Sequence, residues 1–185
     1  MESTTKMALL VMDMQPPILG NLPDARNCIW NVARAIMHAR NENIPVIYVM
    51  VGFRAGAPEI SSHNATFSSY REKWTPATAE QWMKIHPDLT PQPGEIVITK
   101  RRFSAFTGSD LEVVLRGLQL DHLVLTGVAT SGVVLSTLRE AADKDYRLTV
   151  IADCCADRDA EVHHILTTKV FPKQAEVISL EQWVK

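Results

Sequence analysis

A short turn in the second half of the chain has the form of a site that presents a nucleophile, yet it carries no nucleophile. The apolar run at 122–125 predicts a buried strand, which leads through Gly127-Val128-Ala129-Thr130 into a helix that begins near Val133. A strand-to-helix turn of this kind directs one side chain over the carboxyl edge of a sheet, beside backbone N–H groups. We expect that side chain to be Val133. A valine cannot attack a substrate, so the chemistry has to come from its neighbours.

Two charged residues follow other predicted strands. Asp13 comes directly after an apolar run, and Lys100 opens the segment 100–106 after another. Ligands of open parallel sheets bind outside the carboxyl ends of the strands. A carboxylate beside a buried lysine can be a purely structural ion pair; alternatively, partial desolvation shifts its pKa and makes it suitable for moving protons. An acid, a base and a turn rich in hydrogen-bond donors suit hydrolytic chemistry on a small molecule.

Composition and charge narrow the class of protein. The 185 residues suit one domain, 1–185, and a net charge of −2 gives no basis for binding nucleic acid or an anionic membrane. The apolar run before Asp13 is too short for a signal peptide or a membrane span. No Gly-x-Gly-x-x-Gly or phosphate-loop motif is present, so we expect no nucleotide cofactor. Cys28, Cys154 and Cys155 are an odd number of cysteines, which predicts reduced thiols and a cytoplasmic location.

Extended and helical patterns alternate along the chain. We predict strands at 7–12, 44–51, 96–99, 123–126, 148–152 and 176–180. We predict helices at 24–43, 109–117, 133–144 and 159–171, the second opening with a capping box of Ser109 and Glu112. This alternation indicates an α/β protein with a parallel sheet and helices on both faces.

One long segment, 53–94, interrupts the alternation as an insertion. It contains half of the ten prolines and the aromatic residues Phe67, Tyr70, Trp74 and Trp82. Structured insertions of this length commonly act as lids, binding loops or interface arms. Its aromatic side chains either pack on the sheet edge or in a subunit interface, or they wall a substrate pocket over Asp13. We predict a homo-oligomer, a dimer or tetramer, in which this segment or the helix at 133–144 covers a neighbouring subunit.

Three motifs together resemble the isochorismatase-like hydrolases, also called the cysteine hydrolase superfamily, which include nicotinamidases and N-carbamoylsarcosine amidases. They are Asp13-Met14-Gln15, the segment 100–106 with its lysine, and the turn 127–134. The resemblance extends from residue 9 to about residue 180. It implies a three-layer sandwich with six parallel strands in the order 3-2-1-4-5-6, and a cis peptide between Val128 and Ala129. It also places at the site, as substrate-binding or turn residues, Gln15, Phe106, Val128, Ala129 and Thr130.

The resemblance further implies an Asp-Lys-Cys triad, here Asp13, Lys100 and, at the cysteine position, Val133. We expect these three side chains to converge within about 3–6 Å. Nicotinamidases of the family bind a metal through an Asp-x-His pair after the second strand, but Val51-Gly52-Phe53-Arg54 follows here. His63 and His86 have no partners at ligand spacing, which favours surface histidines and no metal.

These residues favour an isochorismatase-family hydrolase that acts on a small metabolite by acid–base chemistry of Asp13 and Lys100, without a cysteine nucleophile. Family members of the isochorismatase type cleave a vinyl ether in this way, with the aspartate as proton donor. The main alternative is a catalytically silent member that binds a small ligand or serves as an assembly unit. A further alternative is an amidase whose thiol has moved to Cys154 or Cys155. Thr130 and Ser131 are expected to cap the following helix, with no histidine base nearby.

Overall fold

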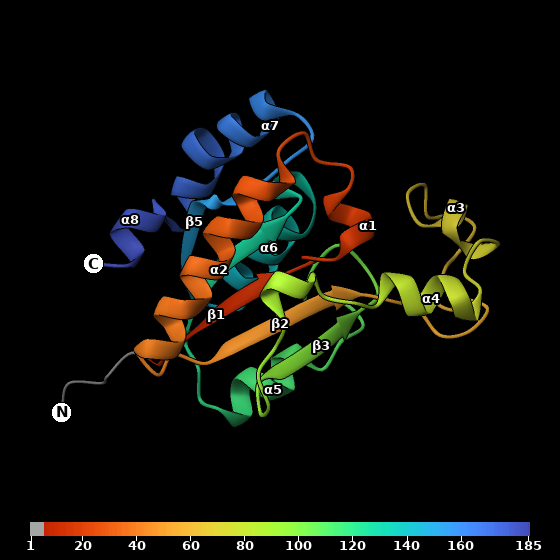
Figure 1. Cartoon of the computed structure of the whole chain (residues 1–185), viewed down its shortest axis with the longest axis horizontal. Coiled ribbons are helices and arrows are strands. Elements are labelled where there is room, and N and C mark those ends of the chain that lie inside the picture. Colours follow the sequence, from red (N-terminus) through yellow and green to blue (C-terminus); the bar gives the residue numbers. More distant parts are fainter. Residues whose placement is uncertain (1–5) are drawn as a thin grey trace.

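The sheet of the protein contains six parallel strands in the order β3-β2-β1-β4-β5-β6. The structure is a computed structural model that describes residues 6–185. The strands are β1 (Met7–Met12), β2 (Val46–Val51), β3 (Ile96–Lys100), β4 (His122–Val128), β5 (Arg147–Ala156) and β6 (Glu176–Ile178), as Figure 1 shows. The predicted strand order and parallel arrangement are therefore confirmed.

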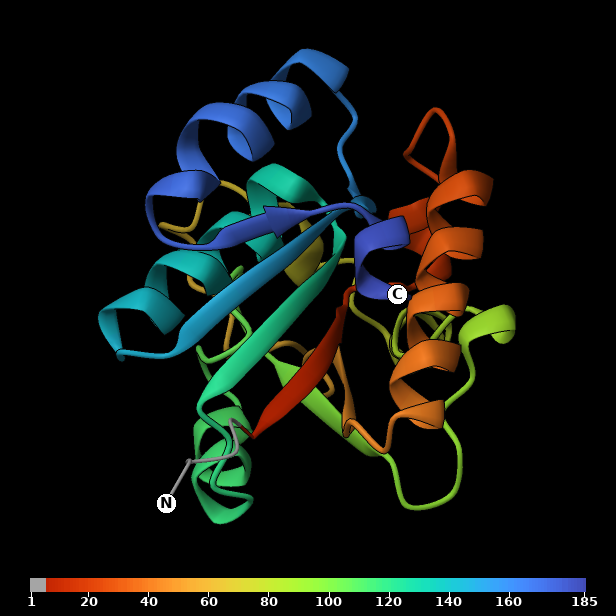
Figure 2. The same cartoon turned by 90° about the vertical axis from the view of Figure 1, so that its left-hand side faces the viewer.

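Helices cover both faces of this sheet, which confirms the three-layer sandwich (Figure 2). Helices α2 (Ala25–Asn41) and α8 (Leu180–Trp183) lie on one face. The other face carries α5 (Leu111–Gly117), α6 (Leu135–Asp143) and α7 (Ala160–Ile165). Because both faces are buried, β1 is apolar throughout, without the polar–apolar alternation of a half-exposed strand.

Several predicted boundaries are wrong for local reasons. The last strand ends at Ile178, before the predicted 180, because Ser179 begins a capping box with Gln182 and starts α8. The helix predicted at 133–144 is a π-helical turn, Thr130–Val134, followed by α6. The helix predicted at 159–171 begins correctly at its Asp159 cap, but after α7 it continues as the π-helical turn Leu166–Val170.

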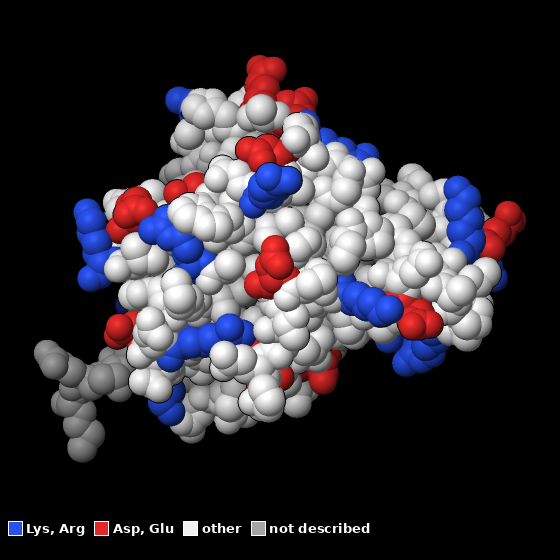
Figure 3. All heavy atoms as spheres, in the orientation of Figure 1, with Lys and Arg blue, Asp and Glu red and all other residues white. Residues whose placement is uncertain are grey.

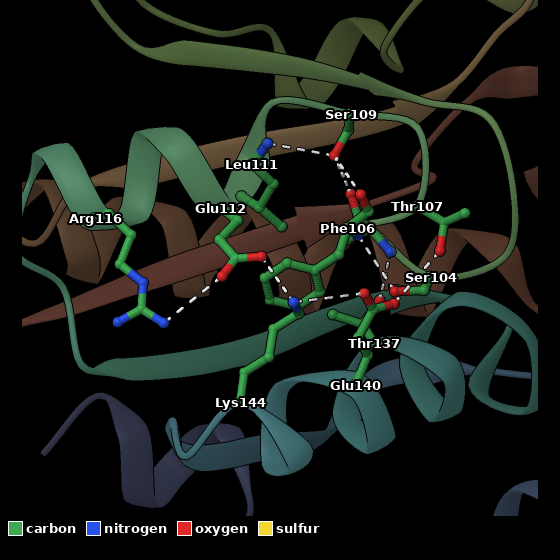
Figure 4. A network of polar contacts seen from close by, with 11 residues as sticks. Ser104, Phe106, Thr107, Ser109, Leu111, Glu112, Arg116, Thr137, Glu140 and Lys144 are labelled. Carbon is green, nitrogen blue, oxygen red and sulfur yellow. Dashed lines mark hydrogen bonds and ion pairs between the residues drawn. The ribbon is translucent and has the colours of Figure 1, made fainter.

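The expected capping box of Ser109 and Glu112 does not form. Helix α5 begins at Leu111, and its N-cap residue Asp110 makes no side-chain bond to the helix. The Ser109 hydroxyl instead donates to carbonyl oxygens of the preceding loop, and Glu112 forms an ion pair with Lys144 at 2.7 Å (Figure 4). Lys144 directly follows α6. The Ser109 hydroxyl also accepts from the Leu111 N–H at 3.3 Å, whereas the Glu112 carboxylate is directed to Lys144 and does not complete a capping box.

Most of the insertion 53–94, up to residue 82, lies beyond the carboxyl ends of β2 and β3, and the rest returns past α2 to the start of β3 (Figure 1). It contains the short helices α3 (Ser68–Arg71) and α4 (Pro76–Trp82) and the 3₁₀ turn Pro87–Leu89, and a further short helix, α1 (Pro16–Leu19), precedes α2. The insertion has its own hydrophobic cluster, which includes Phe53, Phe67 and Trp74. It is therefore a packed element beside the carboxyl edge of the sheet.

Within residues 6–185, no helix is both long enough and apolar enough to cross a membrane. On the face seen in Figure 3, cationic and anionic side chains form small separate groups with uncharged surface between them. That face therefore carries no extended area of one charge.

Candidate functional site

A cavity of about 170 Å³ opens at the carboxyl edge of the sheet, and the structure brings Asp13, Lys100 and Val133 together in its wall. We call the part formed by these three residues and the turn 128–133 the floor. We call the part formed by the insertion the roof. A larger groove of about 690 Å³ lies at the opposite, amino edge, beside Lys6, Asn43 and Leu120, and none of these acid–base groups lines it. The cavity with the floor is therefore the candidate site.

Asp13 and Lys100 form a buried ion pair in the floor. The Asp13 Oδ2 atom lies 2.9 Å from Lys100 Nζ, and Lys100 also donates to the Arg102 carbonyl at 2.8 Å. Both residues are at least 94% buried. The other carboxylate oxygen, Asp13 Oδ1, is buried without a hydrogen-bond partner in the described chain. Since buried polar atoms are nearly always paired, Oδ1 is the atom with capacity to engage a ligand.

The surroundings of Asp13 change its acidity. Burial raises the pKa of this carboxyl from its ordinary value, and the nearby Lys100 ammonium opposes that rise only in part. The backbone at Asp13 has φ 56°, a left-handed conformation that residues other than glycine seldom adopt. Asp13 is therefore held in an unusual backbone geometry, with a carboxyl that keeps its proton to higher pH than an ordinary aspartate.

The turn after β4 forms the rest of the floor. The peptide between Val128 and Ala129 is cis, which confirms the bond that the resemblance implied. Gly127 has φ 134°, and a Cβ there would lie 2.1 Å from the Met12 carbonyl oxygen, so only glycine fits at this close approach of β4 to β1. The side chain of Val133 is buried and lines the cavity, as do Val128 and Ala129.

Thr130 and Ser131 do not cap the following helix, so that prediction is wrong. The turn has no side-chain cap at its start. The Thr130 hydroxyl lies 2.8 Å from Nδ1 of His163, and the Ser131 N–H donates to Asp157 Oδ2 at 2.7 Å. The expectation that no histidine lies nearby is also wrong. His163 was missed because it is on α7, and no sequence pattern pairs that helix with the turn.

Three predicted site residues, Gln15, Phe106 and Thr130, do not line the cavity. The Gln15 side chain is fully buried and accepts from the Val51 N–H at 2.8 Å, donates to the Val51 carbonyl at 3.0 Å, and also donates to the Trp82 carbonyl. Phe106 packs in the core beside Tyr146, with Lys144 Nζ 5.5 Å from its ring centroid (Figure 4). The aromatic side chain that this loop contributes to the cavity is Phe103.

Aromatic side chains of the insertion form the roof. The cavity-lining rings from this segment are Phe53, Phe67, Tyr70, Trp74 and Trp82. Most of these rings contact one another edge to face, with 5.0 Å between the centroids of Phe53 and Trp74. Trp74 Nε1 also donates to the Phe53 carbonyl at 3.0 Å. This arrangement agrees with the pocket-wall interpretation of the insertion.

Arg158, which sequence reasoning missed, lies at the exposed edge of the cavity. Within residues 6–185 its guanidinium makes no hydrogen bond or ion pair, whereas Arg101 pairs with Glu59 at 3.3 Å. Its position three residues after Cys155, just beyond the fifth strand, is the one sequence signal that could have identified it.

The relocated thiol is not at this cavity. Cys28, Cys154 and Cys155 are buried, and none of them lines the wall beside Asp13. Burial raises the pKa of the Cys28 thiol to about 12 and raises the pKa values of Cys154 and Cys155 further, which disfavours the reactive thiolate.

His63 and His86 are the histidines of the insertion that were considered as metal ligands. His63 is exposed, and His86 accepts from the Asp88 N–H at 3.3 Å. In the chain from residue 6 onward, no three histidine, cysteine or acidic side chains form a group that could hold a metal ion.

Known proteins are similar to this chain in sequence and in fold. The Isochorismatase domain model matches residues 7–182. The phenazine biosynthesis protein PhzD of Pseudomonas fluorescens is 32% identical over 97% of this chain and 85% of its own length. The ureidoacrylate amidohydrolase RutB of Variovorax paradoxus is 31% identical over 79% of this chain and 67% of its own. A solved structure of an isochorismatase family protein from Burkholderia thailandensis superposes with a TM-score of 0.83 at 28% identity, covering 97% of this chain and 95% of its own. This chain belongs to the isochorismatase family.

Proposed function

We propose that this protein is a hydrolase that acts on a small, anion-bearing metabolite by proton transfer from Asp13, assisted by Lys100, without a covalent thiol intermediate. The observation that carries the proposal is the state of the Asp13 carboxyl. One oxygen is occupied by Lys100, and the other is buried, unpartnered and part of the cavity wall. A general acid needs such an oxygen within reach of the substrate.

The geometry suits cleavage of a vinyl ether. Asp13 gives its proton to the terminal carbon of the C=C bond, which leaves an oxocarbenium-like carbon next to the ether oxygen. Water adds to that carbon and returns a proton to the Asp13 carboxylate, and the resulting hemiketal breaks into a ketone and an alcohol. Lys100 holds the carboxyl in place and stabilises its ionised form between the two transfers. No step requires a nucleophilic side chain at position 133.

The cavity supports a small substrate with an anionic group. A volume of about 170 Å³ is below the range of about 300–1,000 Å³ typical of drug-sized ligands. The aromatic roof suits a planar, apolar body, and the unpaired Arg158 at the edge suits a carboxylate or a similar anion.

The decisive experiment is Asp13→Asn, measured against a panel of small vinyl ethers and amides that carry a carboxylate. We expect the wild-type protein to turn over a vinyl ether and the variant to lose about 10²–10⁴-fold in kcat. Asp145→Asn is the matched control, because Asp145 also has a positive φ, 62°, and is exposed far from the floor. Unchanged turnover in Asp13→Asn would refute the proposed role of Asp13.

The dependence of the rate on pH tests the direction of proton transfer. An acid role requires the protonated carboxyl, and burial raises the pKa of Asp13. We therefore expect kcat/KM to be highest at low pH and to fall as pH rises through that raised pKa. A rate that rises over the same range would identify Asp13 as a base. Stopped assays between pH 4 and about pH 9, with folding checked by circular dichroism, measure this.

A second candidate function is ligand binding without turnover, and the valine at position 133 is the observation that favours it. Calorimetry with the same panel separates the two. A binder takes up a compound without converting it and retains comparable affinity in Asp13→Asn.

We further propose that the protein forms a homo-oligomer and is located in the cytoplasm. Light scattering at micromolar concentration tests the assembly, and a monomer would contradict it.

A further inference from the structure

The turn in the floor is held from behind by two side chains that lie outside the cavity. Val128, Ala129, Gly132 and Val133 line the cavity, whereas Thr130 and Ser131 do not. These two residues make the contacts to His163 and Asp157 described above, at 2.8 Å and 2.7 Å. The turn therefore has a cavity side and a supported side.

The turn does not supply this support itself. Its internal bonds run from the N–H groups of Gly132 and Val134 to the Ala129 carbonyl, at 3.0 Å and 3.3 Å. Thr130 is completely buried, so its hydroxyl depends on His163 for a partner. Burial lowers the pKa of His163, which favours the neutral imidazole in the hydrogen bond to the Thr130 hydroxyl.

The segment that carries the two partners is itself anchored. Asp159 accepts from the N–H groups of Glu161 and Val162 and so caps α7, where His163 is located. The His163 carbonyl accepts from the Thr167 hydroxyl at 2.9 Å. Arg158, directly between Asp157 and the cap residue, lines the cavity. One short segment thus contacts the turn from behind and also contributes to the cavity.

We infer that Asp157 and His163 are positioning residues, which hold the turn 128–133 in the floor without touching the substrate. The start of α7 thereby sets how Val133 and its neighbours face Asp13. The catalytic consequence of this arrangement rests on the proposed function, whereas the mechanical role can be tested without any substrate.

The test uses the protein with Val133→Cys, because a thiol at this position reports the geometry of the turn. We measure its second-order rate of alkylation by iodoacetamide, with the buried Cys28, Cys154 and Cys155 as internal references. His163→Phe and Thr130→Val should each change that rate at least about fivefold, and the pair together should change it no further, because both remove one hydrogen bond. Thr130→Ser keeps the hydroxyl and should restore the parent rate. Asp157→Ala removes the acceptor of the Ser131 N–H and should change the rate in the same direction as His163→Phe.

Two controls separate positioning from loss of structure. His164→Phe alters the adjacent, exposed histidine, and Ser179→Ala removes the side-chain cap of α8 on the opposite face of the sheet. Neither should change the alkylation rate, although Ser179→Ala should lower the melting temperature. A second readout, hydrogen exchange of the peptide that contains residues 128–134, is independent of thiol reactivity and should accelerate in His163→Phe but in neither control.

The outcomes are distinct. If His163→Phe and His164→Phe give the same alkylation rates and the same exchange, the inference is overturned. If His163→Phe changes both readouts but no compound is hydrolysed by the wild-type protein, the positioning role stands and the proposed function fails. With an active enzyme, we expect His163→Phe to lower kcat with little change in KM, since binding through the roof is left intact.

Discussion

The floor and the roof of the cavity are built on different physical principles. The floor consists of residues at or just beyond the ends of β1, β3 and β4, and hydrogen bonds and one buried ion pair fix its geometry. The roof is a cluster of aromatic rings in an insertion outside the sheet, where the rings contact one another and Trp74 donates to the Phe53 carbonyl. Polar groups in the floor tolerate little change, whereas the packed rings of the roof can be exchanged for others of similar shape.

Gln15 is the connection between the two regions. Its amide pairs with the backbone of Val51 at the end of β2 and reaches the carbonyl of Trp82 at the end of α4. It uses its acceptor oxygen and both donor hydrogens in doing so. The sequence motif that contains Asp13 thus supplies both the acid of the floor and the tie to the roof.

Removal of the lysine from the floor should have the largest effect on stability. Lys100→Met leaves the Asp13 carboxyl buried without its counterion, and we expect a loss of about 3–5 kcal/mol at neutral pH. The pKa of Asp13 should rise further in the variant, because the ammonium that lowers it is gone. The folded state then retains a proton that the unfolded chain releases near pH 3.8, so the stability of the variant should fall as pH rises above that value.

Urea denaturation at several pH values measures this effect. Lys144→Met is the matched control, since Lys144 Nζ lies 2.7 Å from Glu112 Oε2 in an ion pair that is much more exposed than that of Lys100 with Asp13. The control should lose little stability and show no comparable dependence on pH. Equal losses of stability in the two variants would mean that the ion pair in the floor contributes no more to stability than the pair of Lys144 with Glu112.

The contrast also explains what the sequence could and could not predict. Asp13 and Lys100 each follow an apolar strand, and parallel strands bring their carboxyl ends to one edge, so their meeting follows from topology. Phe106 was misplaced because the loop 101–109 has no periodic pattern. Its path depends on long-range contacts, such as the bond from the Ala105 N–H to Thr137 Oγ1 at 2.9 Å.

Other site residues have no local signal at all. The partner of Thr130 is His163, 33 residues further along the chain, and the partners of Gln15 are backbone groups. A backbone carbonyl leaves no mark in a sequence, and a histidine on an amphipathic helix looks like any exposed residue. The floor was predictable where strands determine it, and the supports behind it were not.

Loss of the Gln15 hydrogen bonds that connect the floor to the roof should have an intermediate effect on stability. Gln15→Met fills a similar volume but leaves the N–H and carbonyl of Val51 and the carbonyl of Trp82 unpaired, with an expected loss of about 1–3 kcal/mol. Because the tie to α4 is lost, tryptophan fluorescence should also shift to longer wavelength. Gln81→Met, an exposed change on α4 itself, should alter neither quantity. If Gln15→Met resembles that control, floor and roof are not connected through this amide.

The smallest expected effect concerns Arg158, which belongs to neither region. Its guanidinium is exposed at the edge of the cavity and unpaired in the described chain, so its removal leaves no buried group unsatisfied and should hardly change stability. For a carboxylate-bearing substrate, Arg158→Gln should raise KM about 3- to 10-fold and leave kcat nearly unchanged. Added salt should raise the wild-type KM more than that of the variant, because it screens an exposed charge.

The control variant is Arg26→Gln, which removes an equal charge on α2, away from the cavity, and should leave KM unaltered. A rise in KM of the same size for a neutral analogue would show that Arg158 acts by shape, and the anionic group would then have to be dropped from the proposed substrate.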